Sequence, residues 1–197
     1  MHTDKLVIAT QNSGKLEEYQ NILSPLNIGL ESLADYGVQI QAEETGLTFR
    51  ENALIKAHFG FKQTNVPCLA DDSGLTIDAL NGEPGIHSAR YGEPTFNDAQ
   101  RVELILNNMK DIPAINRTAR FICCIAVVGL TDIPLIVQGS ISGAISLTPS
   151  GNHGFGYDPI FYLPTLKTTM ANLNSETKNN ISHRGDAAWK LLKILNK

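Results

Sequence analysis

The sequence is poor in cysteine and carries no excess of positive charge, and each shortage excludes a class of protein. Three cysteines among 197 residues are too few, and odd in number, for a disulfide-stapled scaffold. Cys68, Cys123 and Cys124 are therefore expected to be reduced. Lysine and arginine number 16 against 20 aspartate and glutamate residues, which gives a net charge of −4. A chain of this charge lacks a broad basic surface, and we expect no nucleic-acid partner.

Long apolar runs are missing as well. No segment approaches the roughly 20 apolar residues that span a bilayer, and residues 1–5 do not have the pattern of a secretory signal peptide. We expect a cytoplasmic protein that has no membrane partner.

The rest of the composition is ordinary for a globular protein, with 42% hydrophobic and 18% charged residues. The length predicts a single domain over residues 1–197. Strands are predicted at 5–9, 28–33, 66–71, 75–79, 120–130, 135–145 and 160–163. Helices are predicted after residue 15, at 48–62, from 97 or 98, at 175–181 and at 186–195. The short turn at 131–134 makes the strands around it antiparallel, so we predict an α/β fold with a mixed sheet.

The stretch Leu69–Leu75 places two adjacent acids after a short apolar run. Asp71 and Asp72 end the predicted strand, and Ser73 and Gly74 follow at once. A strand that ends in this way delivers carboxylates to the carboxyl edge of a sheet, where open α/β folds bind ligands. The alternative is a hairpin turn, because Asp, Ser and Gly are common turn residues.

A second polar segment, Thr10–Lys15, lies between a predicted strand and a predicted helix. A helix N-terminus presents unpaired N–H groups and a partial positive charge, Gly14 allows close approach of the backbone, and Lys15 adds a full charge. These features suit a phosphate group, although the segment does not have the Walker pattern. An ordinary helix cap with a solvated lysine is the alternative.

Four acids suit a magnesium ion: Glu43, Glu44, Asp71 and Asp72. Magnesium binds through one or two carboxylates together with substrate phosphates and water. The histidines and cysteines lack the spacing of a zinc site. A solvated loop is the alternative for the glutamate pair.

Two further polar segments lie near the C-terminus. In Gly154–Asp158 glycines flank Phe155, whose ring either stacks on a base or closes the sheet edge from within. Lys178 and Ser182–Gly185 form a cationic, hydrogen-bonding group, or else a solvated helix end. Together the polar segments supply the parts of a magnesium-dependent nucleoside triphosphate enzyme: a phosphate site, a metal site, a stacking ring and donors for a base.

At these residues the chain resembles the inosine triphosphate pyrophosphatase family, which hydrolyses non-standard purine nucleoside triphosphates. The matching segments follow the family's order and cover almost the whole chain: Ala9–Lys15, Ala42–Phe49, Glu51–Ala53, Ala70–Leu75, Pro84–Ile86, Ser88–Tyr91, Gly154–Pro159 and Ile181–Gly185. The resemblance implies a long mixed central β-sheet flanked by helices, in two lobes with a cleft between them. It also implies cleavage of ITP, dITP or XTP to the nucleoside monophosphate and pyrophosphate, Mg²⁺ as cofactor, and a homodimer.

The resemblance assigns roles to individual residues. Asp72 would accept a proton from water and, with Glu44, would bind the metal. The implied nucleotide contacts are Thr10, Gln11, Asn12, Ser13, Gly14, Lys15, Lys56, Ser73, Phe155, Gly156, Tyr157, Asp158, Lys178, His183 and Arg184. The chain departs from the family at Gln11, where many relatives have Gly, and at His87, where Tyr is frequent.

Two other functions stay open at this point. One is a pyrophosphatase of the related septum-inhibitor type, acting on pyrimidine or modified nucleotides, against which the Ser182-His183-Arg184 motif argues. The other is a nucleotide-binding sensor without turnover, which would have no need of a water-activating acid such as Asp72.

Overall fold

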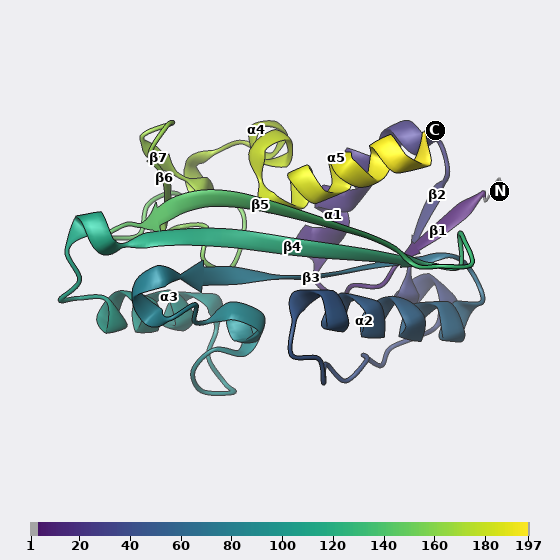
Figure 1. The fold of residues 1–197 in the computed structure, drawn as a ribbon, viewed down its shortest axis with the longest axis horizontal. Helices are drawn as coiled ribbons and strands as arrows, with labels where there is room; N and C mark the ends of the chain where they lie inside the picture. Colours follow the sequence, from purple (N-terminus) through teal and green to yellow (C-terminus); the bar gives the residue numbers. More distant parts are fainter. Residues whose placement is uncertain (1–3, 197) are drawn as a thin grey trace. The chain divides into compact units, whose positions relative to one another are not determined.

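A computed structural model describes residues 4–196 and arranges their strands in one mixed β-sheet (Figure 1). The strand order is β2-β1-β3-β4-β5-β6-β7. The strands are β1 (Lys5–Ile8), β2 (Gly29–Ser32), β3 (Cys68–Ile77), β4 (Thr118–Val128), β5 (Leu135–Ile145), β6 (Phe161–Leu163) and β7 (Thr168–Thr169). β1 is parallel to β2 and β3, whereas β6 is antiparallel to β5 and β7. The predicted mixed sheet is confirmed.

Helices flank these strands and begin where polar side chains cap them. Within residues 4–196 the α-helices are α1 (Ser13–Leu23), α2 (Phe49–Thr64), α3 (Asp98–Asn108), α4 (Ser175–Ile181) and α5 (His183–Leu195). At four of these helix starts a side-chain oxygen accepts a backbone N–H group of the first turn. The capping residues are Asn12, Thr48, Asn97 and Asn174. In this described part of the chain, none of the helices has the length and apolar character needed to cross a membrane.

The chain forms two compact units, each assembled from separate stretches of sequence. The first unit runs up to Asp72 and adds Cys123–Gly139 and the segment from Arg184 onward. The second unit consists of Ser73–Ile122 and Ser140–His183. The predicted single domain with two lobes and a cleft stays a prediction.

In the first unit, apolar side chains alternate between the two faces of the strands. On one face Leu69 of β3 packs with α1 and α5, and on the other face Cys68 and Ala70 pack with α2. Successive side chains of a strand point to opposite faces, so neighbouring residues enter different apolar clusters. The same alternation decides where the two acids that follow must point.

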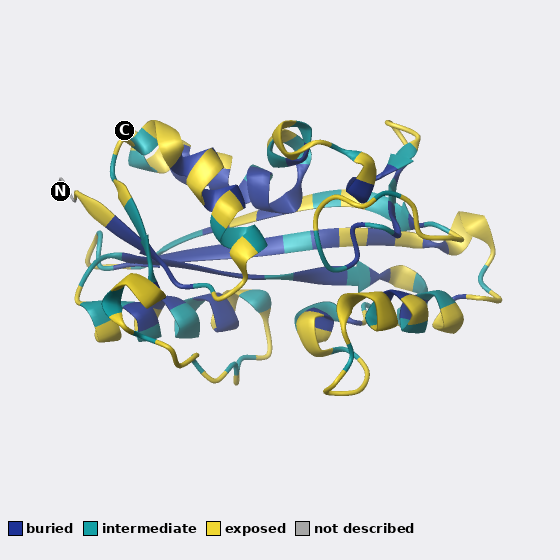
Figure 2. Ribbon diagram, turned by 180° about the vertical axis from the view of Figure 1, so that it is seen from behind, coloured by how far each residue is buried: buried dark blue, intermediate teal, exposed yellow. Residues whose placement is uncertain are grey.

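The second unit has its own apolar core. Val102 and Ile105 of α3 pack with Leu75 and Ile77, which belong to the second half of β3. Figure 2 shows the residues on the outer side of α3 exposed, as expected for an amphipathic helix on a sheet.

β3 differs from the sequence prediction. A strand ending at Asp71 and a second strand at 75–79 are both wrong, because one strand runs without interruption from Cys68 to Ile77. Asp71 and Asp72 therefore lie within the strand and not at its carboxyl end. β1 pairs with β3 only at Cys68 and Leu69, whereas β4 is its neighbour on the other side, and tertiary pairing of this kind outweighs the turn preference of Asp-Ser-Gly.

One helix also starts earlier than predicted. α5 begins at His183 and not at Asp186. The Ser182-His183-Arg184 motif is thus the junction between α4 and α5, with Ser182 as the residue that ends α4.

Candidate active site

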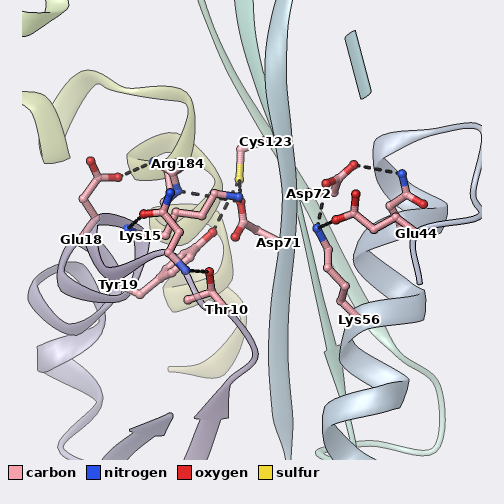
Figure 3. Close-up of polar contacts among 12 residues, drawn as sticks. Thr10, Lys15, Glu18, Tyr19, Glu44, Lys56, Asp71, Asp72, Cys123 and Arg184 are labelled. Atoms are coloured by element: carbon pink, nitrogen blue, oxygen red, sulfur yellow. Dashed lines mark hydrogen bonds and ion pairs between the residues drawn. The ribbon is translucent and has the colours of Figure 1, made fainter. Parts of the chain in front are cut away.

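Asp71 and Asp72 are buried and lie on opposite faces of β3 (Figure 3). Asp71 points toward Lys15 of α1 and Asp72 toward Lys56 of α2. The prediction that these two acids belong to one cluster is therefore wrong, because a strand turns adjacent side chains to opposite faces. Two separate charge clusters result.

On the α2 face, two carboxylates converge on one ammonium group. Lys56 Nζ lies 2.7 Å from Glu44 Oε1 and 2.8 Å from Asp72 Oδ1. The other oxygen of Asp72, Oδ2, accepts a hydrogen bond from Asn52 Nδ2 at 3.3 Å. Asn52 and Lys56 are one helical turn apart on α2, so a single helix presents both partners to Asp72.

The pKa values on this face reflect burial and charge together. Burial raises the pKa of Asp72 above that of an ordinary aspartate, and the positive charge of Lys56 offsets this only in part. Burial works to lower the pKa of Lys56, but the negative charges of Asp71 and Asp72 outweigh burial and raise it. Asp72 is thus a stronger proton acceptor than a solvated aspartate, beside a firmly charged lysine.

On the α1 face, Asp71 is surrounded by cations. Lys15 Nζ is 2.7 Å from Asp71 Oδ2, and Arg184 Nε is 3.9 Å from the same oxygen. Burial would raise the pKa of Asp71, but Lys15 and Arg184 overcome it and hold the pKa well below its usual range. Arg184 also donates to Glu18. Asp71 is a fixed negative charge that anchors two cations.

The phosphate segment predicted at residues 10–15 does lie at a helix start. The Asn12 side chain accepts the backbone N–H of Lys15 at 3.0 Å, and Thr10 Oγ1 accepts the N–H of Asn12 at 3.2 Å. Gln11, where the chain departs from the family, donates from Nε2 to the carbonyl of Gln39 at 3.0 Å. The segment is therefore tied to the loop that leads to Glu44, a contact that glycine could not make.

In the second unit, Asp158 organises another group of predicted residues. Lys178 Nζ donates to Asp158 Oδ2 at 2.7 Å, and the backbone N–H of Phe155 donates to the same oxygen at 3.0 Å. Lys178 also lies over the Phe155 ring, 4.6 Å from its centroid. Gly154 has a positive φ of 78°, which favours glycine and lets the loop turn tightly. The structure brings Phe155, Asp158 and Lys178 together.

Two other predicted nucleotide contacts in this unit point inward. Tyr157 is buried, and its hydroxyl donates to the carbonyl of Ser88 at 2.9 Å. His183 is buried and stacks on Phe121, with ring centroids 4.7 Å apart. Tyr157 therefore supports the loop, and the aromatic contact fixes the plane of the His183 ring.

Comparison with known proteins decides the family. The family model that matches is that of the Ham1 family, over residues 6–194. The chain belongs to the Ham1 family.

Relatives of this Ham1 protein agree in sequence and in fold. A protein of Bacillus subtilis named dITP/XTP pyrophosphatase is 46% identical over 189 residues, which cover 96% of each chain. Solved HAM1 structures from Coxiella burnetii and Staphylococcus aureus are 44% and 40% identical, with TM-scores of 0.90 and 0.87. Each match covers 98% of this chain. It covers 99% of the Coxiella burnetii chain and 98% of the Staphylococcus aureus chain. The resemblance to the inosine triphosphate pyrophosphatase family and the predicted α/β fold with a mixed sheet flanked by helices are confirmed.

The donor set on the α2 face of this Ham1 protein fits a magnesium ion. Glu44 and Asp72 offer hard carboxylate oxygens that already converge on the positive charge of Lys56. Among residues 4–196 no three His, Cys, Asp or Glu residues gather as a metal site. Two carboxylates match the needs of magnesium, which completes its coordination with water and substrate phosphates. Glu43, in contrast, is exposed.

Two residues of this region, Asn52 and Glu18, have no role predicted from the sequence. Asn52 is fully buried beside Asp72, and Glu18 anchors Arg184 on the α1 face. Asp71, predicted to belong to the metal-binding acids, anchors the cations of the α1 face instead. Asn52 carries a signal in the sequence, since it precedes Lys56 by four residues on a helix that reaches the acids. Glu18 carries none that local pattern reveals, because its partner Arg184 is far away along the chain.

Proposed function

We propose that this protein hydrolyses non-standard purine nucleoside triphosphates such as dITP, XTP and ITP to the nucleoside monophosphate and pyrophosphate, with Mg²⁺ as cofactor. The observation that carries the proposal is the convergence of the Glu44 and Asp72 carboxylates on the ammonium group of Lys56. Relatives of similar length are named dITP/XTP pyrophosphatase. The activity would remove such nucleotides from the pool before they enter DNA or RNA.

In this proposal Asp72 accepts the proton of the attacking water, a role for which its buried carboxylate lies beside Lys56. Glu44 and Asp72 would hold a magnesium ion, which would supply polarisation of the scissile phosphate. Lys56 and Lys15 offset phosphate charge. Asp71 keeps Lys15 in place through the ion pair of 2.7 Å.

Selection against ATP is proposed to depend on the 6-position of the purine, and refusal of GTP, which also has a 6-oxo group, on its 2-amino group. Inosine and xanthosine carry a 6-oxo group, which accepts a hydrogen bond, whereas adenosine carries a 6-amino donor. His183, Arg184 and backbone N–H groups are the proposed donors. A site built on buried hydrogen bonds rejects an analogue that fails to make them by up to about 10⁴–10⁵-fold.

The test is a comparison of kcat/KM for dITP, XTP, ITP, ATP and GTP by pyrophosphate release. We expect the three non-standard nucleotides to exceed ATP and GTP by orders of magnitude. Equal values for ITP and ATP would contradict the proposed selectivity. Preference for pyrimidine or modified nucleotides would favour the septum-inhibitor type, and binding without turnover would favour a sensor. The predicted homodimer, cytoplasmic location and absence of a nucleic-acid partner stay predictions.

A further inference from the structure

Asn52 is a buried polar side chain to which the proposed mechanism gives no part. It lies in the first turns of α2, and none of its surface is exposed. A buried amide has to satisfy both its donor and its acceptor, since an unmet hydrogen bond there costs about 1–3 kcal/mol. Its partners therefore show what the side chain is placed to do.

The two ends of the Asn52 amide bind two different parts of the candidate site. Its nitrogen donates to Asp72 Oδ2 at 3.3 Å, and its oxygen accepts the backbone N–H of Gly46 at 2.8 Å. Gly46 lies in the same loop as Glu44, two residues after it and before the start of α2. One side chain thus links the acid on β3 to the loop that bears the second carboxylate.

The packing around Gly46 shows that this link is close. A Cβ added at Gly46 would lie 2.6 Å from Asn52 Oδ1 and 2.9 Å from the Asn52 backbone nitrogen. Only glycine lets the loop approach α2 this closely. The loop is therefore built to meet the amide.

The link also fixes the orientation of Asp72. Lys56 binds one carboxylate oxygen, Oδ1, and Asn52 binds the other, Oδ2. With both oxygens held from α2, the carboxylate plane is set. An ionised aspartate side chain at position 52 could accept from Gly46 but could not donate to Asp72, beside which it would place a second negative charge, so the two functions of the amide can be separated by substitution.

We infer that Asn52 is a positioning residue that orients Asp72 and locks the Glu44 loop against α2, so that the two carboxylates face one cation. This inference rests on the proposed function, because it assigns Asn52 a part in the same reaction. Residues that orient the ligands of a metal site typically contribute about 10–100-fold in activity or metal affinity.

The experiment compares Asn52→Asp and Asn52→Ala with the wild type. Activity is followed as kcat and KM for dITP with Mg²⁺, and the loop as hydrogen exchange of the Gly46 amide. Asn52→Asp keeps the acceptor for Gly46 and loses the donor to Asp72. We expect it to retain Gly46 protection while kcat falls about 10–100-fold. Asn52→Ala should lose both protection and kcat, with KM changed much less than kcat.

Thr48→Ala is the matched control. Thr48 caps the start of α2 through the N–H of Glu51, and its loss should lower stability by about 1 kcal/mol without touching Asp72. We expect its kcat to stay within twofold of the wild type. A loss of kcat in Thr48→Ala equal to that of the Asn52 variants would overturn the inference in favour of simple loosening of the helix.

The outcomes separate the inference from the proposed function. If the wild type is active and Asn52→Asp and Asn52→Ala both stay within twofold of its kcat, the inference is overturned and the function stands. If the wild type releases no pyrophosphate from dITP, the function is overturned, and the inference with it. Protection of the Gly46 amide from hydrogen exchange in Asn52→Asp shows that this variant is folded. Its loss of kcat then cannot be attributed to unfolding.

Discussion

At the scale of single residues, Asp72 is the side chain on which the proposed chemistry depends. Its burial raises its pKa, and Lys56 and Asn52 hold its two oxygens. We expect Asp72→Asn to lower kcat by about 10²–10⁴-fold while most of the nucleotide affinity remains. Steady-state kinetics and calorimetric titration measure the two effects.

Glu43, which precedes Glu44 in the sequence, supplies the control for the Asp72→Asn variant. Its side chain is exposed, so Glu43→Gln should leave kcat unchanged. If Asp72→Asn retained near-normal kcat, Asp72 would not be the proton acceptor.

Asp71 predicts a dependence of stability on pH. Its folded pKa is well below the unfolded value of about 3.9, because Lys15 and Arg184 favour the charged form. The resulting stabilisation is fully present above pH of about 4 and is lost as the pH falls toward the folded pKa. We expect Asp71→Asn to lower the free energy of unfolding by about 3–5 kcal/mol near pH 7.

Urea unfolding of the wild type and of Asp71→Asn at pH 7, 5 and 3 checks this. The difference between the two proteins should be constant from pH 7 to 5 and should narrow at pH 3. A difference that grew on acidification would mean that the pKa of Asp71 is raised in the folded protein.

At the scale of secondary-structure elements, α2 packs unusually close to the strands of the first unit. A Cβ added at Gly60 would lie 2.3 Å from Cys68 Sγ on β3 and 3.1 Å from Ala9 Cβ. Gly60→Ala must therefore displace either the Cys68 side chain or the helix, and we expect a loss of about 1–3 kcal/mol of stability despite the better helix propensity of alanine. Because α2 carries Lys56, kcat should fall as well.

Gly29→Ala is the control for this prediction. A Cβ there would lie 3.4 Å from the carbonyl of Asp4, an ordinary contact. Thermal unfolding should show a lower Tm for Gly60→Ala and little change for Gly29→Ala. An unchanged Tm for Gly60→Ala would mean that the helix is not held against β3.

The elements also show where prediction from sequence succeeds and where it fails. The start of α2 could be predicted because Thr48 and Glu51 are a local capping signal, and the structure has Thr48 accepting the N–H of Glu51. β3 could not be predicted whole, because Asp-Asp-Ser-Gly locally favours a turn and only pairing with distant strands holds it extended. The wrong prediction that Asp71 and Asp72 lie in one cluster follows from that same error.

At the scale of the whole molecule, each unit joins stretches that are far apart in sequence. The first unit combines the chain up to Asp72 with Cys123–Gly139 and the segment from Arg184 onward. Local patterns predicted most of the elements but not this assembly, because the contact of Arg184 with Glu18 depends on packing and not on spacing. The ordered motifs along the chain resemble those of a known family, and this resemblance predicted the fold.

The most direct test of the proposed reaction is to identify the products formed from dITP by phosphorus NMR, with Mg²⁺ and with EDTA. Hydrolysis between the α- and β-phosphates predicts dIMP and pyrophosphate in equal amounts with Mg²⁺, and no turnover with EDTA. Formation of dIDP and phosphate, or equal turnover in EDTA, would contradict it.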